Sequence, residues 1–444
     1  MDYAAVWRLK CDVLQACFET FGARDATDAL RREFERFVAA GAASLERFAL
    51  FAAIAALHPR VPWQSWPDGL REPQGAETRS FAQRNARRVR FALYLQWLAD
   101  VQFGDAARVA RASGLAFGFF RDLAVGAAPD GAEVWAHPQG FARGVAVGAP
   151  PDPFSTSGQN WNLPPPNPEA LIANDCAPFR ELLAANMRHA GALRIDHVMA
   201  LTRLFWIPDG AAPIDGAYVS YPLTTLLGAL ASESQRAQCL VVGEDLGTVP
   251  EGFRERLAAA EVLSYRVLWF ERTGSSFAAP SRYPAKAATA VSTHDLPTIA
   301  GWWTGADIAE KAELGLLDAD GEMAAKLERA RDKRALAEAI DAAGVAEGAA
   351  LAPYAPHDAP LTAAVHRFAG AAPSALVLVQ ADDLALETTV LNLPGTDRER
   401  PNWRRKVRTS VDALWQTPAA RLTTAGFARR EGPACRVAPD LGRE

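Results

Sequence analysis

The sequence is poor in cysteine, and the cysteines present form no recognisable framework. Five occur in 444 residues, at positions 11, 17, 176, 239 and 435, and none belongs to a CxxC pair. An odd, scattered set argues against both a disulfide scaffold and a zinc site. We therefore expect a protein of a reducing compartment, the cytoplasm.

Other signals are also missing. The start, Met1-Asp2-Tyr3-Ala4, lacks the basic and apolar regions of a secretory signal. No uninterrupted apolar run reaches the ~20 residues that span a bilayer. The formal net charge is -5 and the Arg-rich stretches are short, so no basic stripe indicates nucleic acid or an anionic membrane as a partner. No GxGxxG or GxxxxGK[ST] motif follows a candidate strand, which argues against a phosphate loop.

The first part of the chain has a helical pattern. Apolar residues recur at helical spacing over residues 1–57, and 87–113 predicts a long amphipathic helix. Residues 126–168 are rich in Gly and Pro and are expected to form an irregular but ordered binding loop. We predict a helical subdomain over 1–85, inserted in a catalytic barrel portion over 86–444. That portion would carry a substrate-loop insertion over 126–175 and a helical insertion over 301–355.

The rest of the chain alternates short apolar runs with helical patterns, which is typical of a parallel sheet. Predicted strands span 114–122, 191–198, 239–245, 264–271, 289–295 and 375–380, and predicted helices span 179–189, 223–234 and 252–260. Several of these strands end in a polar residue, among them Asp122, Asp196, Glu244 and Asp295. This placement predicts an α/β fold of the (β/α)8 TIM-type barrel class, whose active site lies at the carboxyl ends of its strands. An open doubly wound sheet would also place ligands there.

Asp196 lies in the run Leu193-Arg194-Ile195-Asp196-His197. In a strand, Arg194 and Asp196 share one face, and pairing with the guanidinium would favour the ionised carboxylate. An ionised, oriented carboxylate is what nucleophilic attack on a sugar requires. On this stretch alone, a structural ion pair explains the residues equally well.

Two further carboxylates extend the hypothesis. Glu244 follows an apolar run, and an apolar environment raises the pKa of a carboxyl, as a general acid requires. A nucleophile and an acid/base ~5–5.5 Å apart suffice for glycosyl transfer with retention. Asp295 would bind sugar hydroxyls and stabilise the positive transition state. His197 and His294 can donate hydrogen bonds to sugar hydroxyls, although a lone histidine is more often structural.

Three motifs together resemble the amylomaltases, the 4-α-glucanotransferases of the α-amylase clan. They are Leu193-Arg194-Ile195-Asp196-His197, Gly243-Glu244-Asp245-Leu246-Gly247 and the stretch 292–298, Ser-Thr-His-Asp-Leu-Pro-Thr. Further agreement occurs, in order, at 94–97, 121–126, 148–152, 158–161, 216–219, 266–271, 392–396 and 401–403. The resemblance implies Asp196 as nucleophile, Glu244 as acid/base and Asp295 as transition-state stabiliser.

The resemblance also implies a set of substrate-binding residues and an activity. The implied substrate contacts are Arg194, His197, His294, Trp161, Asp152 and Asn392. Family members transfer 1,4-α-glucan segments between maltooligosaccharides and need neither cofactor nor metal. The implied function is a retaining 4-α-glucanotransferase acting on maltooligosaccharides and linear α-1,4-glucans. An α-glucan hydrolase and an inactive glucan-binding fragment are the alternatives.

The sequence departs from the family pattern in three places. Pro153 stands where some members carry an aromatic residue, and Asn162 replaces a common glycine. The first two barrel strands have no counterpart among the predicted ones. We therefore expect an incomplete barrel, corresponding to about the C-terminal two-thirds of an amylomaltase.

Overall fold

The computed structural model describes residues 1–151, 157–346 and 351–427. The chain divides into two compact units. The N-terminal unit is Asp2–Val262, and the C-terminal unit is Leu263–Glu444 together with Met1. The boundary lies between a helix and a strand, away from the limits predicted for the insertions. Each unit is described by itself.

The N-terminal unit contains three parallel strands. These are β1 (Phe119–Leu123), β4 (Ala190–Ile195) and β7 (Leu240–Gly243), and they pair in that order. The central strand β4 is buried along nearly its whole length, as its apolar sequence predicts. Its carboxyl end therefore presents the residues that follow it beside the ends of β1 and β7.

The C-terminal unit contains three more parallel strands. These are β8 (Leu263–Val267), β11 (Ala287–Ala290) and β12 (Leu376–Leu378), with β11 in the centre. All four residues of β11 are buried, and three of them are alanines. Such small side chains allow neighbouring helices to approach the strand closely.

The six parallel strands overlap the six predicted runs, but five end earlier than predicted, β4 at Ile195 and β7 at Gly243 among them. β8 ends at Val267, β11 at Ala290 and β12 at Leu378. Glu271, Asp295 and Gln380 therefore lie in the segments after these strands. After β11, the Ser292 hydroxyl donates a hydrogen bond to the carbonyl of Pro297 at 2.7 Å. This local bond closes a loop and competes with continuation of the strand.

The expectation of an irregular segment over 126–168 is wrong. Two strands within it, β2 (Val145–Ala149) and β3 (Gln159–Leu163), join an antiparallel sheet of order β3-β2-β5-β6. The other two strands are β5 (Arg203–Pro208) and β6 (Ala217–Ser220). A Cβ at Gly148 would lie 2.1 Å from the carbonyl oxygen of Gln159. Glycine is therefore required at this position for the close approach of two strands.

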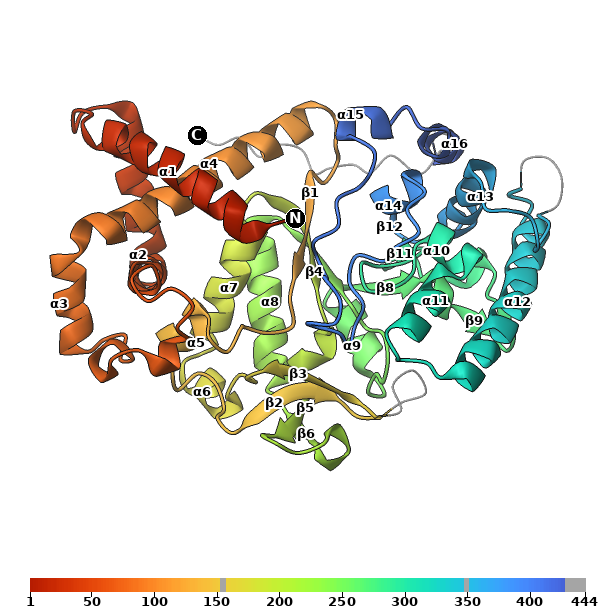
Figure 1. Cartoon of the computed structure of the whole chain (residues 1–444), viewed down its shortest axis with the longest axis horizontal. Helices are drawn as coiled ribbons and strands as arrows, with labels where there is room; N and C mark the ends of the chain where they lie inside the picture. Colours follow the sequence, from red (N-terminus) through yellow and green to blue (C-terminus); the bar gives the residue numbers. More distant parts are fainter. Residues whose placement is uncertain (152–156, 347–350, 428–444) are drawn as a thin grey trace. The chain divides into compact units, whose positions relative to one another are not determined.

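Helices make up most of the rest of the N-terminal unit (Figure 1). They are α1 (Tyr3–Gly22), α2 (Ala29–Ala55), α3 (Ala76–Arg84), α4 (Ala86–Ala112), α5 (Ala132–Ala136), α6 (Pro168–Ala173), α7 (Ala177–Met187), α8 (Leu223–Ala237) and α9 (Phe253–Ala259). An aromatic core joins α1, α2 and α4. Phe21 lies 5.2 Å and Phe34 5.7 Å from Trp97, between ring centroids.

Helix α2 is the one described helix that is long and apolar enough to cross a membrane by length and composition alone. Its apolar sequence is interrupted by Glu46 and Arg47, and Arg47 lies 3.7 Å from Glu181 of α7. At Ala42 the backbone has φ 42° and ψ -142°, so the helix is kinked there. Phe34 and Ile54 of α2 are fully buried. We interpret α2 as a packed helix of this unit.

The C-terminal unit also contains seven described helices, which lie between and after its parallel strands in the sequence. They are α10 (Ile299–Thr304), α11 (Ala306–Glu313), α12 (Ala319–Ala342), α13 (Ala359–Gly370), α14 (Ala381–Leu384), α15 (Val411–Leu414) and α16 (Pro418–Phe427). Two short strands, β9 (Arg272–Thr273) and β10 (Ser276–Phe277), form a hairpin. Helix α13 is buried along most of its length.

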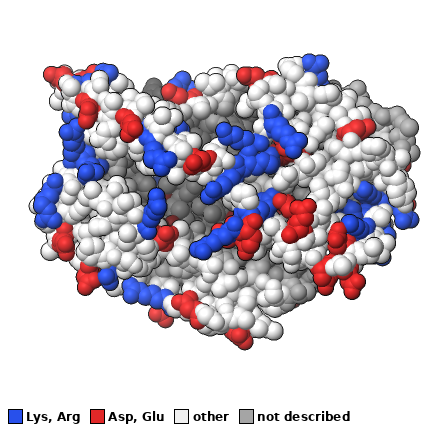
Figure 2. Space-filling view, viewed as in Figure 1, with Lys and Arg blue, Asp and Glu red and all other residues white. Residues whose placement is uncertain are grey.

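The described surface has charges of both signs. On the face drawn in Figure 2, basic side chains lie in small groups with acidic side chains beside or between them. This distribution agrees with the short, interrupted basic stretches of the sequence.

Candidate functional site

The carboxyl end of β4 carries Arg194 and Asp196. Arg194 NH2 lies 2.8 Å from Asp196 Oδ1, so the predicted ion pair is confirmed, although Asp196 follows the last residue of the strand. The second nitrogen, NH1, donates a hydrogen bond at 2.7 Å to Asp122 Oδ1 on β1. One guanidinium thus contacts a carboxylate at the ends of two neighbouring strands.

The charge of Arg194 is stabilised although its side chain is buried. Burial acts against the charge, but the carboxylates of Asp196 and Asp122 outweigh it and raise the pKa of Arg194 above its ordinary value. Pairing with this permanent cation favours the negatively charged form of Asp196. The nucleophile candidate is therefore held ionised and oriented.

Glu244 lies at the end of the neighbouring strand β7. Its backbone N–H donates to the carbonyl of Ile195 at 2.9 Å, and its carbonyl accepts from Val198 at 2.9 Å. Its carboxylate accepts two backbone hydrogen bonds, from His197 to Oε2 and from Leu246 to Oε1, both at 2.8 Å. Asp196 and Glu244 thus follow adjacent parallel strands, and both are fixed by backbone contacts.

The environment of Glu244 favours its protonated form. Burial raises the pKa of this carboxyl to about 7, with a smaller contribution from the negative charge of Asp196. The backbone donors and Arg194 act in the opposite direction. The predicted rise is confirmed in direction and cause. Near neutral pH, a protonated Glu244 and a charged Asp196 coexist at neighbouring strand ends, which is the division of roles that acid catalysis needs.

His197 is held neutral beside these groups. Burial, followed by the charge of Arg203, lowers its pKa to about 4. Its backbone has φ 45°, in the left-handed region, which turns the chain away from β4 and directs its N–H to Glu244. A neutral imidazole can donate one hydrogen bond and accept another.

Trp161 of β3 lies against His197. The two ring centroids are 5.3 Å apart at an interplanar angle of 80°, and the indole N–H donates to Gln159 at 3.0 Å. Asn162, the next residue, has φ 54°. Asparagine adopts this left-handed conformation more readily than most non-glycine residues, so it can replace glycine here. The antiparallel sheet therefore brings an aromatic ring to the end of β4.

In the C-terminal unit, Asp295 lies in the loop after β11. Asn392 Nδ2 donates to Asp295 Oδ1 at 2.7 Å, and His294 Nε2 lies 3.3 Å from Asp295 Oδ2. The backbone N–H of Asn392 donates to the carbonyl of His294 at 3.0 Å. The ring of Trp403 lies 5.0 Å from that of His294. Asp295, His294 and Asn392 therefore form one contact group.

Buried polar contacts anchor the end of the Asp295 loop. Thr298 caps α10 and donates to the carbonyl of Glu387 at 2.5 Å. Asp383, which is 1% exposed, accepts a hydrogen bond from the backbone of Ile299 at 2.8 Å. These bonds fix the loop to the segment that precedes Asn392.

The predicted site residues thus fall into two described groups. The N-terminal unit brings together Asp196, Glu244, Arg194, His197 and Trp161. The C-terminal unit brings together Asp295, His294 and Asn392. Asp152 and Pro153 lie outside the described residues.

Sequence reasoning missed two residues of these groups. Asp122 was recognised as a polar strand end but not as a partner of Arg194, and Trp403 was noted only within a motif. In the parallel register of β1 and β4, Asp122 is opposite Arg194. A cation and a carboxylate at the ends of two predicted strands were the available signal, but their register could not be predicted from sequence.

Asp196 also lines a cavity of about 180 Å³ in the N-terminal unit. Its walls are mainly apolar and include Leu123, Phe141 and Tyr221, with the carboxyl-bearing Glu133 among them. Burial raises the pKa of Glu133. Within 1–151, 157–346 and 351–427, no group of three or more His, Cys, Asp or Glu side chains could hold a metal ion.

These features define the class of the protein. It is an α/β protein whose parallel strands alternate with helices, and the carboxylates of Asp196, Glu244 and Asp295 follow three of these strands. The described residues contain six parallel strands, and a full barrel of this class has eight, so the fold is an incomplete (β/α)8 barrel with helical insertions.

The chain belongs to the 4-alpha-glucanotransferase family, whose model matches residues 1–411. It is 34% identical to a 4-alpha-glucanotransferase of Haemophilus influenzae over 433 residues, covering 94% of this chain and 62% of that protein. It is 40% identical to one of Mycobacterium tuberculosis over 368 residues, covering 81% of this chain and 50% of that protein.

Solved structures agree with this assignment. The structure resembles the amylomaltase from Corynebacterium glutamicum with a TM-score of 0.85 and 29% identity, covering 95% of this chain and 59% of that one. The fold is also shared with an amylomaltase from Streptococcus agalactiae in complex with acarbose, at a TM-score of 0.75 and 20% identity, covering 96% of this chain and 79% of that one. The chain thus spans about half to three-fifths of the length of the curated relatives compared.

Proposed function

We propose that the protein is a retaining 4-α-glucanotransferase that acts on maltooligosaccharides and linear α-1,4-glucans in maltodextrin metabolism. The observation that carries this proposal is the contrast between Asp196 and Glu244. One carboxylate is paired with Arg194 at 2.8 Å, and the other has a pKa raised by burial to about 7. The membership of the chain in the 4-alpha-glucanotransferase family supports the same roles for these two residues.

In the first step, the carboxylate of Asp196 attacks the anomeric carbon of a glucan. The bond between that carbon and the glycosidic oxygen breaks, and Glu244 gives its proton to the departing oxygen. The leaving glucan gains a 4-hydroxyl, and a covalent glycosyl ester remains on Asp196. Arg194 keeps the nucleophile charged before attack and leaves it in a fixed orientation.

In the second step, the 4-hydroxyl of another glucan replaces the ester. Glu244, now ionised, accepts the proton of that hydroxyl while its oxygen attacks the anomeric carbon, and the bond to Asp196 breaks. Two inversions give net retention. His197 is neutral at this pH and can donate a hydrogen bond to a sugar hydroxyl, with Trp161 offering a ring face beside it.

We assign Asp295 the stabilisation of the positively charged transition state. The amide of Asn392 and the imidazole of His294 fix both of its oxygens within 3.3 Å. A carboxylate oriented in advance needs no reorganisation when positive charge develops on the sugar ring.

The test is disproportionation of maltotriose by the full chain. We expect glucose and longer maltooligosaccharides, with the α configuration retained by NMR. Asp196→Asn should abolish transfer, whereas Asp209→Asn, an exposed aspartate after β5, should not affect it. Products of hydrolysis alone would indicate a hydrolase. Full activity of Asp196→Asn would remove the nucleophile role.

A further inference from the structure

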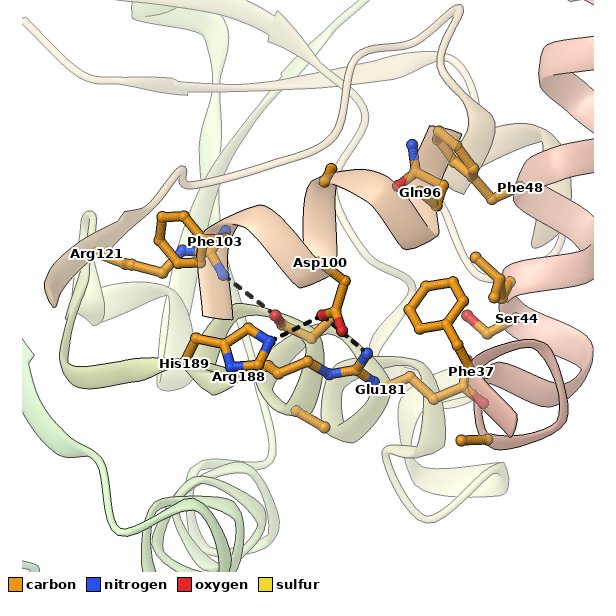
Figure 3. A pocket seen from close by; sticks show the side chains of 16 residues that line it. Phe37, Ser44, Phe48, Gln96, Asp100, Phe103, Arg121, Glu181, Arg188 and His189 are labelled. Carbon is orange, nitrogen blue, oxygen red and sulfur yellow. Dashed lines mark hydrogen bonds and ion pairs between the residues drawn. The ribbon is translucent and has the colours of Figure 1, made fainter. Parts of the chain in front are cut away.

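A second pocket in the N-terminal unit lies among helices α2, α4 and α7. Its volume is about 600 Å³, within the range of small-molecule sites. The side chains that line it point inward from three helices and from the end of α7 (Figure 3). Asp196 and Glu244 are not among its lining residues.

Three aromatic rings line the pocket. Phe37 and Phe48 come from α2 and Phe103 from α4. Phe48 is 39% exposed, so its ring face is accessible from solvent. The kink of α2 at Ala42 lies between the two α2 rings, next to Gly41, which also lines the pocket.

Charged side chains lie beside these rings: the Arg121 guanidinium is 5.2 Å from the centroid of the Phe103 ring, and the Arg188 guanidinium is 5.8 Å from that of the Phe37 ring. Asp100 Oδ1 accepts from Arg188 at 3.2 Å and lies 3.1 Å from His189 Nε2, as the dashed lines in Figure 3 show. Arg121 donates to the backbone carbonyls of Ala185 and Asn186 at 3.2 and 3.0 Å. Arg188 is thus paired with a carboxylate, and Arg121 is bonded to two backbone carbonyls.

Several polar groups of the lining retain unused hydrogen-bonding capacity. Within the described part of the chain, no residue bonds to the Ser44 hydroxyl, the Gln96 amide, Asp100 Oδ2 or His189 Nδ1. Together they offer both donors and acceptors around one space. A purely apolar ligand would leave these groups without partners, at a loss of binding free energy.

The pocket adjoins the cavity beside Asp196 through a third, smaller cavity. That cavity shares Ser44 and Glu181 with the pocket, and Glu133 and His137 with the cavity that Asp196 lines. All three belong to the N-terminal unit. The pocket and the cavity that Asp196 lines are therefore linked by shared wall residues of the smaller cavity within one unit.

We propose that this pocket is a remote binding site for a segment of an α-1,4-glucan chain. The ring faces of Phe37 and Phe48 contact the apolar faces of glucose units, and Gln96, Ser44 and Asp100 bond to their hydroxyls. The identity of the sugar rests on the proposed function. A glucan held here increases the local concentration of long substrates near Asp196, and a chain too short to be retained gains nothing.

The first experiment counts binding sites by calorimetric titration with maltoheptaose. It uses the full chain carrying Asp196→Asn, so that the sugar is not converted. We expect two binding events, and loss of one when Phe48→Ala and Gln96→Ala are added. The matched control is Gln102→Ala, an exposed glutamine of the same helix outside the pocket, which should keep both. A single event before the pocket is changed, or two events afterwards, overturns the proposal.

The second experiment compares substrates of different length in the enzyme with Asp196 intact. Gln96→Ala should lower kcat/KM for maltoheptaose about threefold to tenfold, as expected for loss of one hydrogen bond, and leave maltotriose unchanged. An equal loss for both substrates would contradict a remote site. Absence of maltotriose transfer in the parent would refute the proposed function, and the titration would still decide the pocket. If the variant with Phe48→Ala fails to fold, Ser44→Ala replaces Phe48→Ala in the calorimetric titration.

Discussion

Asp122 and Arg194 face one another across β1 and β4, with Asp122 Oδ1 accepting a hydrogen bond from Arg194 NH1 at 2.7 Å. The other nitrogen of the same guanidinium is 2.8 Å from Asp196. Asp122 thus acts on the proposed nucleophile through Arg194. It fixes the position of the guanidinium and compensates its charge.

We predict that Asp122→Asn lowers kcat for maltotriose about tenfold and leaves KM nearly unchanged. The amide still accepts a hydrogen bond, but it no longer carries the charge that helps to orient Arg194, so Asp196 is less well positioned. Steady-state kinetics at several pH values measure the effect. Asp105→Asn, an exposed aspartate on α4, is the matched control. A rise in KM with unchanged kcat would instead make Asp122 a substrate-binding residue.

The pKa of Glu244 predicts the pH dependence of the first step. As general acid, Glu244 must be protonated, and burial raises its pKa to about 7. We expect kcat/KM to be nearly constant below that pH and to fall about tenfold per unit above it. Maltosyl fluoride is a donor whose leaving group needs no proton. With this donor, kcat/KM of Glu244→Gln should show no such fall at high pH. If the fall of kcat/KM at high pH persists in this variant, the titrating group is not Glu244.

Much of this site could be predicted because its determinants are close in sequence. The spacing of Arg194 and Asp196 by two residues sets them on one face of a strand, and their ion pair follows. The apolar run before Glu244 indicates burial, and burial raises its pKa. Both inferences need only local geometry and the polarity of neighbouring residues.

Other features depend on contacts between distant residues. Asp122 is 72 positions from Arg194, and their pairing depends on the register of two strands. The β2–β3 pair was predicted to be part of a loop because residues 126–168 are rich in Gly and Pro, whereas at Gly148 the glycine allows another strand to approach closely. The end of β11 is set by the Ser292 hydroxyl bonding to Pro297, so Asp295 lies in a loop. No local pattern in the sequence specifies these contacts.

The carboxyl of Glu244 also makes the stability of the protein depend on pH. The pKa of Glu244 is about 7 in the folded protein and 4.5 ordinarily, so the native state binds a proton more tightly than the unfolded one. Its contribution is therefore present at low pH and is lost as pH rises from 4.5 to about 7. Between pH 5 and 8, the free energy of unfolding should fall by on the order of 2–3 kcal/mol more in the parent than in Glu244→Gln. Urea denaturation at both pH values measures the difference, and parallel curves would refute it.

Asn392 should be sensitive to charge. Its amide donates to Asp295 at 2.7 Å, so Asn392→Asp replaces a donor with a second carboxyl group. We expect kcat to fall about a hundredfold at pH 8, with partial recovery at lower pH as the introduced carboxyl is protonated. Asn392→Ala, which removes the donor without adding charge, should show a smaller loss and no such recovery. Equal losses at every pH would show that the amide acts only through packing.

Gly148 tests the antiparallel sheet as the support of Trp161. A Cβ at this position would lie 2.1 Å from the Gln159 carbonyl oxygen and 2.5 Å from Ile207 Cδ1, so Gly148→Ala must separate β2 from its neighbours. We expect a loss of about 1–3 kcal/mol in stability and a higher KM for maltotriose, since Trp161 moves with β3. Gly228→Ala, in an exposed turn of α8 with nothing within 4 Å of the added Cβ, should instead stabilise by about 0.5–1 kcal/mol. If Gly148→Ala lowers the melting temperature and leaves KM unchanged, Trp161 does not contact the glucan.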